Sequence, residues 1–341
     1  MMNIHSALKY MAVVAVAAMA LTGCRHQNDS LMKRGTTQQD IVLLRLEPVI
    51  FGTPTDQLQA KLNEVRTDFR TPMLNIFPED PKFMEQVKGM AQDPTMREVY
   101  DSVMALYPDL EWLRKELQQG MKNLGKASQN IHCNRVYTFI SGDFDYEHRA
   151  VADMEDGLLV AIDQYTTSHF EKYGYFGLPK YLAKLLDKQY LATDCMSAIV
   201  KARIPIPDRD LTMLDYMVAE GKALYCTRLA FPKVEDSILL RYSSEQLAWA
   251  EHNVADVWAY IIQHKLLYET DYNEFNNILD DAPKTNAFGD KSAPRMAAYI
   301  GYQIVKEFAQ GRSADLERML ENTESQSILQ QSGWKPVRSR R

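Results

Sequence analysis

The spacing of apolar residues predicts helices through the first third of the chain. Leu58, Leu62 and Val65 start one stripe, because gaps of three and four residues place side chains on one face of an α-helix. The same spacing recurs in two short segments around Val87 and Val99. A longer segment, residues 110–124, follows a proline and an aspartate that are typical of helix starts. We therefore expect four helices in this part of the chain.

Three short runs rich in β-branched and apolar residues have the composition of strands. The first spans residues 41–51 and contains Pro48, which cannot donate a hydrogen bond to a neighbouring strand, so we expect it near a sheet edge. The second spans residues 136–141 and stops at Gly142, which favours a turn. The third, residues 157–163, fits a strand or a helix. Together the three runs predict a small β-sheet.

Beyond the third run the helical period dominates. Ser243 and Gln246 have the spacing of a capping box at the start of one helix. Pro294 and Gly311 bound another, since proline favours the first turn of a helix and glycine the position after its end. Neither a repeat nor a low-complexity linker divides the sequence. The pattern predicts a single domain of the α+β class, predominantly α-helical, over residues 41–337.

The first residues have the pattern of a secretory signal with a lipidation site. Residues 11–21 form an apolar run of eleven residues, shorter than the about 20 that a membrane-spanning helix needs. The sequence Leu-Thr-Gly-Cys follows, which resembles the bacterial lipobox, with Cys24 as acceptor of a diacylglyceryl group. We expect a signal peptide over residues 1–23, acylation of the new amino group, and a polar tether over residues 24–40. The alternative is a plain secretory signal that happens to contain a cysteine.

Composition and charge narrow the classes of function. The chain has 341 residues, 46% hydrophobic and 25% charged, which is ordinary for a folded protein and argues against intrinsic disorder. Its 39 Lys and Arg against 45 Asp and Glu give a net charge of −6, which argues against binding of duplex nucleic acid. Removal of residues 1–23, where Lys9 carries the only charge, would leave 318 residues with a side-chain charge of −7. Residues 338–341 form a basic tail.

Three cysteines remain after lipidation of Cys24: Cys133, Cys195 and Cys226. An exported protein meets an oxidising compartment, so a disulfide among them is allowed. Their odd number leaves at least one thiol, and Cys195 and Cys226 lie near helical patterns, where buried thiols are common. The sequence does not choose which cysteine would pair with Cys133.

The common motifs of catalysis and cofactor binding are absent. None of the seven histidines lies three or four residues from another, so the helical zinc motif HExxH is missing, as is CxxC. The motifs GxxxxGK[ST], GxGxxG and GxSxG are missing as well. Two carboxylate pairs remain as candidates for acid and base roles, Asp143 with Asp145 and Glu220 with Glu251. For the first pair, turn formation is the simpler interpretation.

Two later helices carry the remaining candidates for a binding groove, which are Glu220, Lys222, Tyr225, Glu251 and Trp258. A glycine inside a helix lowers stability, so Gly221 suggests that another element approaches closely there. Glu220 would then be partly buried, either as a functional carboxylate or as a hydrogen-bonded core residue. Glu251 falls on the apolar stripe of its helix and would need a polar partner.

Several longer segments carry a family resemblance. They are residues 136–141 (VYTFIS), 176–181 (FGLPKY), 215–225 (DYMVAEGKALY), 242–249, 251–258, 292–295 (SAPR), 300–305 (IGYQIV) and 328–336 (ILQQSGWKP). In this order they resemble the gliding motility lipoprotein GldB family. The resemblance covers most of the mature chain and includes the lipobox.

The resemblance implies a scaffold similar to that of zinc-dependent peptidases of the HExxH type. In those enzymes an EG-x-A-x-Y segment on a later helix supplies a metal ligand, which corresponds to Glu220 here. The segment that would carry HExxH, residues 190–204, contains no histidine. The resemblance therefore implies a zincin-like scaffold without its catalytic apparatus, metal or other cofactor. The alternative is a metal-dependent peptidase or hydrolase that uses Glu220 in a non-standard site.

The resemblance also implies where and with what the protein acts. We expect a lipoprotein that is held in the membrane through Cys24 and contacts other envelope proteins of a motility or secretion complex. Surface export in such bacteria accompanies acidic residues just after the lipidated cysteine, and residues 25–28 (RHQN) lack them. We therefore expect an outer-membrane protein that faces the periplasm.

Overall fold

The computed structural model describes residues 40–69, 76–128, 130–142, 146–152, 157–166, 177–310 and 315–336. Over these residues the protein is α+β and mostly helical, with a four-stranded sheet, as the apolar pattern predicts. Contacts divide the chain into two compact units, Met1–Arg114 with Cys133–Gly177 and Lys115–His132 with Leu178–Arg341. The signal peptide, Cys24, Asp143, Asp145 and the basic tail lie outside the described residues.

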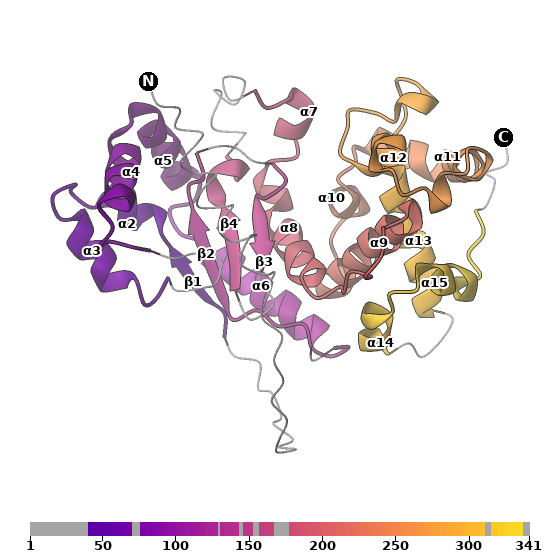
Figure 1. The fold of residues 1–341 in the computed structure, drawn as a ribbon, viewed down its shortest axis with the longest axis horizontal. Coiled ribbons are helices and arrows are strands. Elements are labelled where there is room, and N and C mark those ends of the chain that lie inside the picture. Colours follow the sequence, from indigo (N-terminus) through magenta and orange to yellow (C-terminus); the bar gives the residue numbers. More distant parts are fainter. Residues whose placement is uncertain are drawn as a thin grey trace, which may run out of the picture. The chain divides into compact units, whose positions relative to one another are not determined.

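The three predicted strands pair in the first unit. Strands β1 (Val42–Arg45), β2 (Arg135–Phe139) and β4 (Gly157–Ala161) run parallel, with Leu44 opposite Tyr137 and Tyr137 opposite Leu159. Strand β3 (Ala150–Ala152) pairs antiparallel with β4. Figure 1 shows the resulting order β1-β2-β4-β3. The position of the first run at a sheet edge is confirmed, whereas the three-residue β3 was not predicted.

The first and third runs are shorter strands than the sequence predicts. Strand β1 ends at Arg45, and helix α2 (Glu47–Gly52) begins two residues later. Pro48 lies in the first turn of α2, where a missing N–H is harmless because that turn has no carbonyl partner for it. The prediction of a strand through residue 51 is therefore wrong. Strand β4 likewise gives way at residue 162 to the 3₁₀-helix η1 (Ile162–Tyr165).

The predicted helices of the first unit form, and their apolar stripes pack together. They are α3 (Leu58–Val65), α4 (Pro81–Gln92) and α5 (Pro94–Leu106). Leu58 and Leu62 from α3 and Val87 from α4 are buried in one cluster with Tyr137 from the sheet. The stripe that defined each helix in the sequence is therefore its core face.

Helices make up the second unit. The first of them, α6 (Glu111–Leu124), also includes the last four residues of the preceding part of the first unit. The others are α7 (Lys180–Ala183), α8 (Lys188–Lys201), α9 (Met213–Ala230), α10 (Asp236–Leu240), α11 (Ser244–Gln263), α12 (Tyr272–Leu279), α13 (Met296–Gln310), α14 (Leu316–Glu321) and α15 (Ser325–Ser332), with the 3₁₀-helices η3 (Leu266–Tyr268) and η4 (Asn286–Phe288). The predicted capping box of Ser243 and Gln246 is present.

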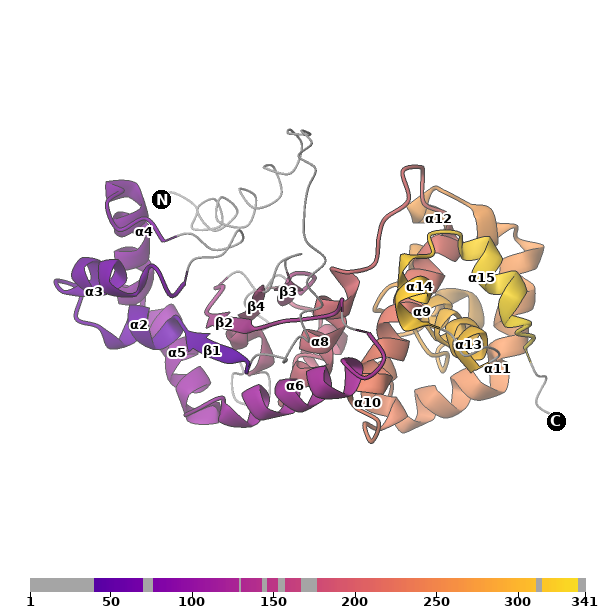
Figure 2. The ribbon, with the colours of Figure 1, turned by 90° about the horizontal axis from the view of Figure 1, so that it is seen from below.

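Helices α9 and α13 lie against each other at two glycines, and Figure 2 shows them side by side. A Cβ atom on Gly221 would lie 2.3 Å from the carbonyl oxygen of Gly301, and one on Gly301 would lie 1.8 Å from that of Met217. No side chain fits at these distances. The close approach that Gly221 predicts is therefore confirmed, and it fixes Glu220, the preceding residue, close to the helix crossing.

Two further features of the fold concern the cysteines and the search for a membrane-spanning helix. The thiols of Cys133, Cys195 and Cys226 are buried, and no disulfide joins any two of them. Burial raises the pKa of Cys226 to about 12, which keeps it protonated and unreactive. No helix in the described ranges has the length and apolar character needed to cross a membrane.

Candidate functional site

The predicted groove residues lie in four different surroundings of the second unit. Glu220 belongs to a set of charged residues that we call the Glu220 cluster, comprising Lys201, Glu220, Asp281 and Arg295. Lys222 is buried. Glu251 lines an open groove, and Trp258 packs against a second tryptophan in the lining of that groove. Tyr225 is half-buried on α9, and burial raises its pKa.

Both carboxylate oxygens of Glu220 are bound by cations. Its Oε1 atom lies 2.5 Å from Nζ of Lys201 at the end of α8, and its Oε2 accepts a hydrogen bond of 3.1 Å from Nη2 of Arg295 just before α13. Arg295 also lies 3.6 Å from Asp281. Burial alone would raise the pKa of Glu220, but the charges of Lys201 and Arg295 hold it below its usual value. Glu220 is therefore a stable, ion-paired carboxylate.

Helix α8, which covers most of the segment where HExxH would lie, also contributes an ion pair that is buried. Asp194 pairs with Arg241, and both residues are buried. The guanidinium of Arg241 also donates a 2.8 Å hydrogen bond to the carbonyl of Leu185 and lies over the ring of Tyr190. Asp194 of α8 is therefore ion-paired in the protein interior and does not line an open site.

These residues do not fit a zinc ion. A zinc ligand must present a lone pair to the metal, whereas the oxygens of Glu220 face an ammonium and a guanidinium that would repel Zn²⁺. Helix α8 supplies no imidazole. Among the described residues, no three His, Cys, Asp or Glu side chains gather as metal ligands would.

Lys222 stabilises the end of a neighbouring helix and does not line the groove. Its Nζ donates hydrogen bonds to the carbonyls of Leu320, at 3.1 Å, and Asn322, at 2.7 Å, which are the last residue but one of α14 and its C-cap. A cation at a helix C-terminus also opposes the negative end of the helix dipole. Burial lowers the pKa of Lys222 to about 8.

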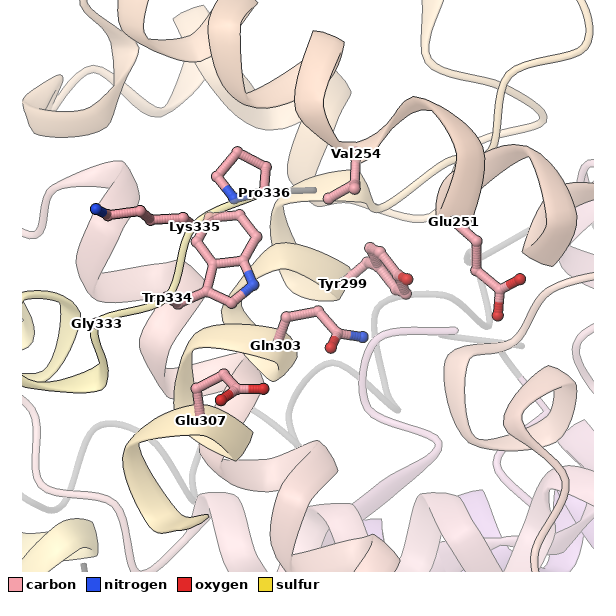
Figure 3. A pocket seen from close by; sticks show the side chains of 9 residues that line it. All are labelled: Glu251, Val254, Tyr299, Gln303, Glu307, Gly333, Trp334, Lys335 and Pro336. Carbon is pink, nitrogen blue, oxygen red and sulfur yellow. The ribbon is translucent and has the colours of Figure 1, made fainter. Parts of the chain in front are cut away.

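An open groove of about 460 Å³ lies between α11, α13 and the segment after α15. Nine residues line it, namely Glu251, Val254, Tyr299, Gln303, Glu307, Gly333, Trp334, Lys335 and Pro336. Three of them, Tyr299, Gln303 and Glu307, follow one another at intervals of one turn along α13. Figure 3 shows them along the same side of the groove. We call this the α11–α13 groove.

The inner wall of the α11–α13 groove is a buried tyrosine. Tyr299 is 7% exposed and hydrogen-bonds the side chain of Gln303. Burial, followed by the negative charge of Glu251, raises the pKa of Tyr299 to about 12. Its hydroxyl therefore keeps its proton at neutral pH and can donate a hydrogen bond.

The surroundings of Glu251 differ from those that its sequence predicts. The sequence predicts a carboxylate on the apolar stripe that needs a polar partner, but Glu251 is exposed, because the stripe of α11 runs through Ala250, Val254 and Val257 and leaves Glu251 at its edge. Glu220 and Glu251 also have different neighbours, an ion-pair cluster for one and the groove for the other. The structure thus supports no joint acid and base role for them.

Four residues of the groove are not among the candidates that the sequence indicates: Tyr299, Gln303, Glu307 and Trp334. The first three recur every four residues, a spacing that places them on one face of α13 and could have indicated a shared surface. Trp334 gave no such signal, because it follows α15 in an irregular segment. Its ring meets that of Trp258 edge to face, with 5.3 Å between centroids.

Fold and site define a class of protein: a mainly helical α+β protein with an ion-paired carboxylate at a helix crossing and an open groove lined by polar and aromatic residues. The sequence model of a family described as gliding motility protein GldB matches residues 28–336. The chain belongs to this family, and membership associates it with gliding motility and with lipoproteins. No curated protein and no solved structure matches the chain significantly.

Proposed function

We propose that this lipoprotein acts without catalysis in gliding motility or in the secretion machinery linked to it, through contacts with other envelope proteins. The observation that carries the proposal is the pairing of Glu220 with Lys201 and Arg295. The family resemblance makes Glu220 the counterpart of a metal ligand, and here its charge is already neutralised. A scaffold related to zinc peptidases would thus be kept for its surface.

The chemistry of peptide hydrolysis supports this interpretation. A metallopeptidase needs a bound metal to activate water and to polarise the substrate carbonyl. The Glu220 cluster provides two cations where that metal would need ligands, and Asp194 is held by Arg241. Restoring a zinc site would require breaking several ion pairs, so the arrangement favours a structural role.

The metal content of the protein tests the proposal. We would purify the Cys24→Ser protein, which cannot be lipidated, and measure bound zinc by mass spectrometry. We expect substoichiometric metal, and we expect Glu220→Gln to complement a deletion strain as well as Glu274→Gln, an exposed control on α12. Stoichiometric zinc that is lost in Glu220→Gln would overturn the proposal in favour of a metal-dependent hydrolase.

The place of the protein is part of the proposal. Acyl chains on Cys24 would anchor it stably, since each buried methylene contributes about 0.8 kcal/mol. We propose the outer membrane with the protein facing the periplasm, because residues 25–28 lack the acidic export pattern. Protease added to whole cells should leave the protein intact and should degrade it once the outer membrane is permeabilised. Degradation in intact cells would instead place it on the surface.

A further inference from the structure

We propose that the α11–α13 groove binds an arginine side chain of a partner protein. This inference rests on the proposed function, which supplies a protein partner, and it names the chemistry that the partner presents. Three properties of the groove support it: unpaired negative charge, unused hydrogen-bonding groups and an aromatic wall.

The negative charge comes from two helices. Glu251 on α11 and Glu307 on α13 line the same cavity, both are exposed, and neither forms an ion pair with any residue in the described ranges. In Figure 3 the carboxylate of Glu307 is turned toward Gln303, whereas Glu251 lies on the opposite side of the lining, beyond Tyr299. Lys335 also lines the groove, but its side chain extends away from them. Two carboxylates around one cavity favour a cationic ligand.

The hydrogen-bonding groups lie at the inner wall. Tyr299 and Gln303 bond to each other, which uses one of the three bonds available to a hydroxyl and one of the four available to an amide. The hydroxyl of Tyr299 and the amide of Gln303 both lie at the groove in Figure 3, where they can form further hydrogen bonds. A ligand with several donors, such as a guanidinium, could bond the amide carbonyl of Gln303 and the carboxylate of Glu307, one turn further along α13, at once.

The aromatic wall is Trp334. Its indole lines the groove and makes an edge-to-face contact with Trp258. A guanidinium stacks on an indole face with about 0.5–2 kcal/mol of stabilisation, and its planar fork matches a carboxylate better than an ammonium does. The cavity, about 460 Å³, lies within the size range of small-ligand sites. Arginine therefore fits the groove better than lysine.

A peptide titration tests the inference. The probe is a ten-residue Gly-Ser peptide with one central arginine, added to the ¹⁵N-labelled Cys24→Ser protein while the indole N–H signal of Trp334 is followed. The matched control peptide carries citrulline, which has the shape of arginine without its charge. We expect the arginine peptide to shift the Trp334 signal and the citrulline peptide to bind about tenfold more weakly or not at all.

Substitutions in the groove locate the binding. Glu307→Gln should weaken binding about three- to tenfold and Glu251→Gln should weaken it less, whereas Asp256→Asn, an exposed carboxylate on α11 outside the groove, should leave it unchanged. Equal binding of the two peptides, or a Trp334 signal that does not move, would overturn the inference. These outcomes are independent of the zinc measurement, so failure of the groove and failure of the non-catalytic role can be told apart.

Discussion

At the scale of single residues, one buried amide works against stability. Gln164 in η1 is fully buried, and neither its Nε2 nor its Oε1 has a hydrogen-bond partner among the residues that the structure describes. Its neighbour Asp163 is also buried but accepts bonds from the backbone N–H groups of Ser141 and Gly142. A buried polar group without a partner costs about 1–3 kcal/mol.

We therefore predict that Gln164→Met stabilises the protein by about 1–3 kcal/mol, since methionine has a similar shape and no amide to desolvate. Urea unfolding of the Cys24→Ser protein measures the change. The adjacent Asp163→Asn should have the opposite effect, because it removes an acceptor from bonded N–H groups. A loss of stability in Gln164→Met would show that the amide has a ligand or water that compensates its burial.

Lys222 makes stability depend on pH in the alkaline range. Burial lowers its pKa from the ordinary 10.5 to about 8. Between these values the unfolded chain binds a proton that the folded chain does not, so stability rises with pH in this window. The destabilisation caused by burying the charged form of Lys222 is fully present below pH 8 and is lost as the pH approaches 10.5.

The prediction concerns the difference between the wild type and Lys222→Met. The free energy of unfolding of the wild type should rise relative to that of the variant by up to about 3 kcal/mol between pH 8 and 10.5, because each pKa unit corresponds to about 1.4 kcal/mol. Urea titrations at several pH values measure it. Groups that titrate in both proteins cancel in the difference. If the free energies of unfolding of the wild type and of Lys222→Met changed in parallel with pH over this range, the lowered pKa of Lys222 would be contradicted.

At the scale of elements, the crossing of α9 and α13 depends on two glycines. We predict that Gly301→Ala destabilises the protein by about 1–3 kcal/mol or more, because its Cβ would overlap the backbone carbonyl of Met217 and the helices must move apart. Gly89→Ala is the matched control, since Gly89 is also inside a helix and its Cβ would meet nothing within 4 Å. That change should stabilise by about 0.5–1 kcal/mol, and thermal unfolding of both variants checks the contrast.

The sequence predicts elements well where local rules and burial agree. The stripe of Leu58 and Leu62, the capping box at Ser243 and the constraint at Gly221 each have a direct structural counterpart. The prediction failed at Pro48, because apolar composition favours a strand while the chemistry of proline also suits a helix start, and only tertiary pairing decides between them. Strand β3 is too short to show any period.

The candidate site was harder to predict than the elements. The sequence indicates that Glu220 is partly buried, but its partners Lys201 and Arg295 come from distant positions that only the fold brings together. The groove likewise brings residues of α11 and α13 together with Trp334, and no local sequence pattern predicts that these segments lie close together. Ligand sets and cavities are properties of tertiary contacts, so residue spacing alone cannot define them.

At the scale of the whole molecule, the two compact units do not divide the chain into two consecutive halves. The chain passes from one unit to the other after Arg114, after His132 and after Gly177. The first of these boundaries falls inside α6, a continuous helix from Glu111 to Leu124. Because a helix forms cooperatively, unfolding of one unit should disturb residues that belong to the other.

We therefore predict that the single domain expected over residues 41–337 unfolds in one cooperative transition. Tryptophan fluorescence reports mainly the second unit, which holds Trp249, Trp258 and Trp334, whereas far-ultraviolet circular dichroism reports the helices of both. The two signals should coincide in urea. Gln164→Met in the first unit and Gly301→Ala in the second should each shift both signals together. Two separate transitions would show instead that the two units fold independently. Each variant would then shift only the transition of the unit that contains the substitution.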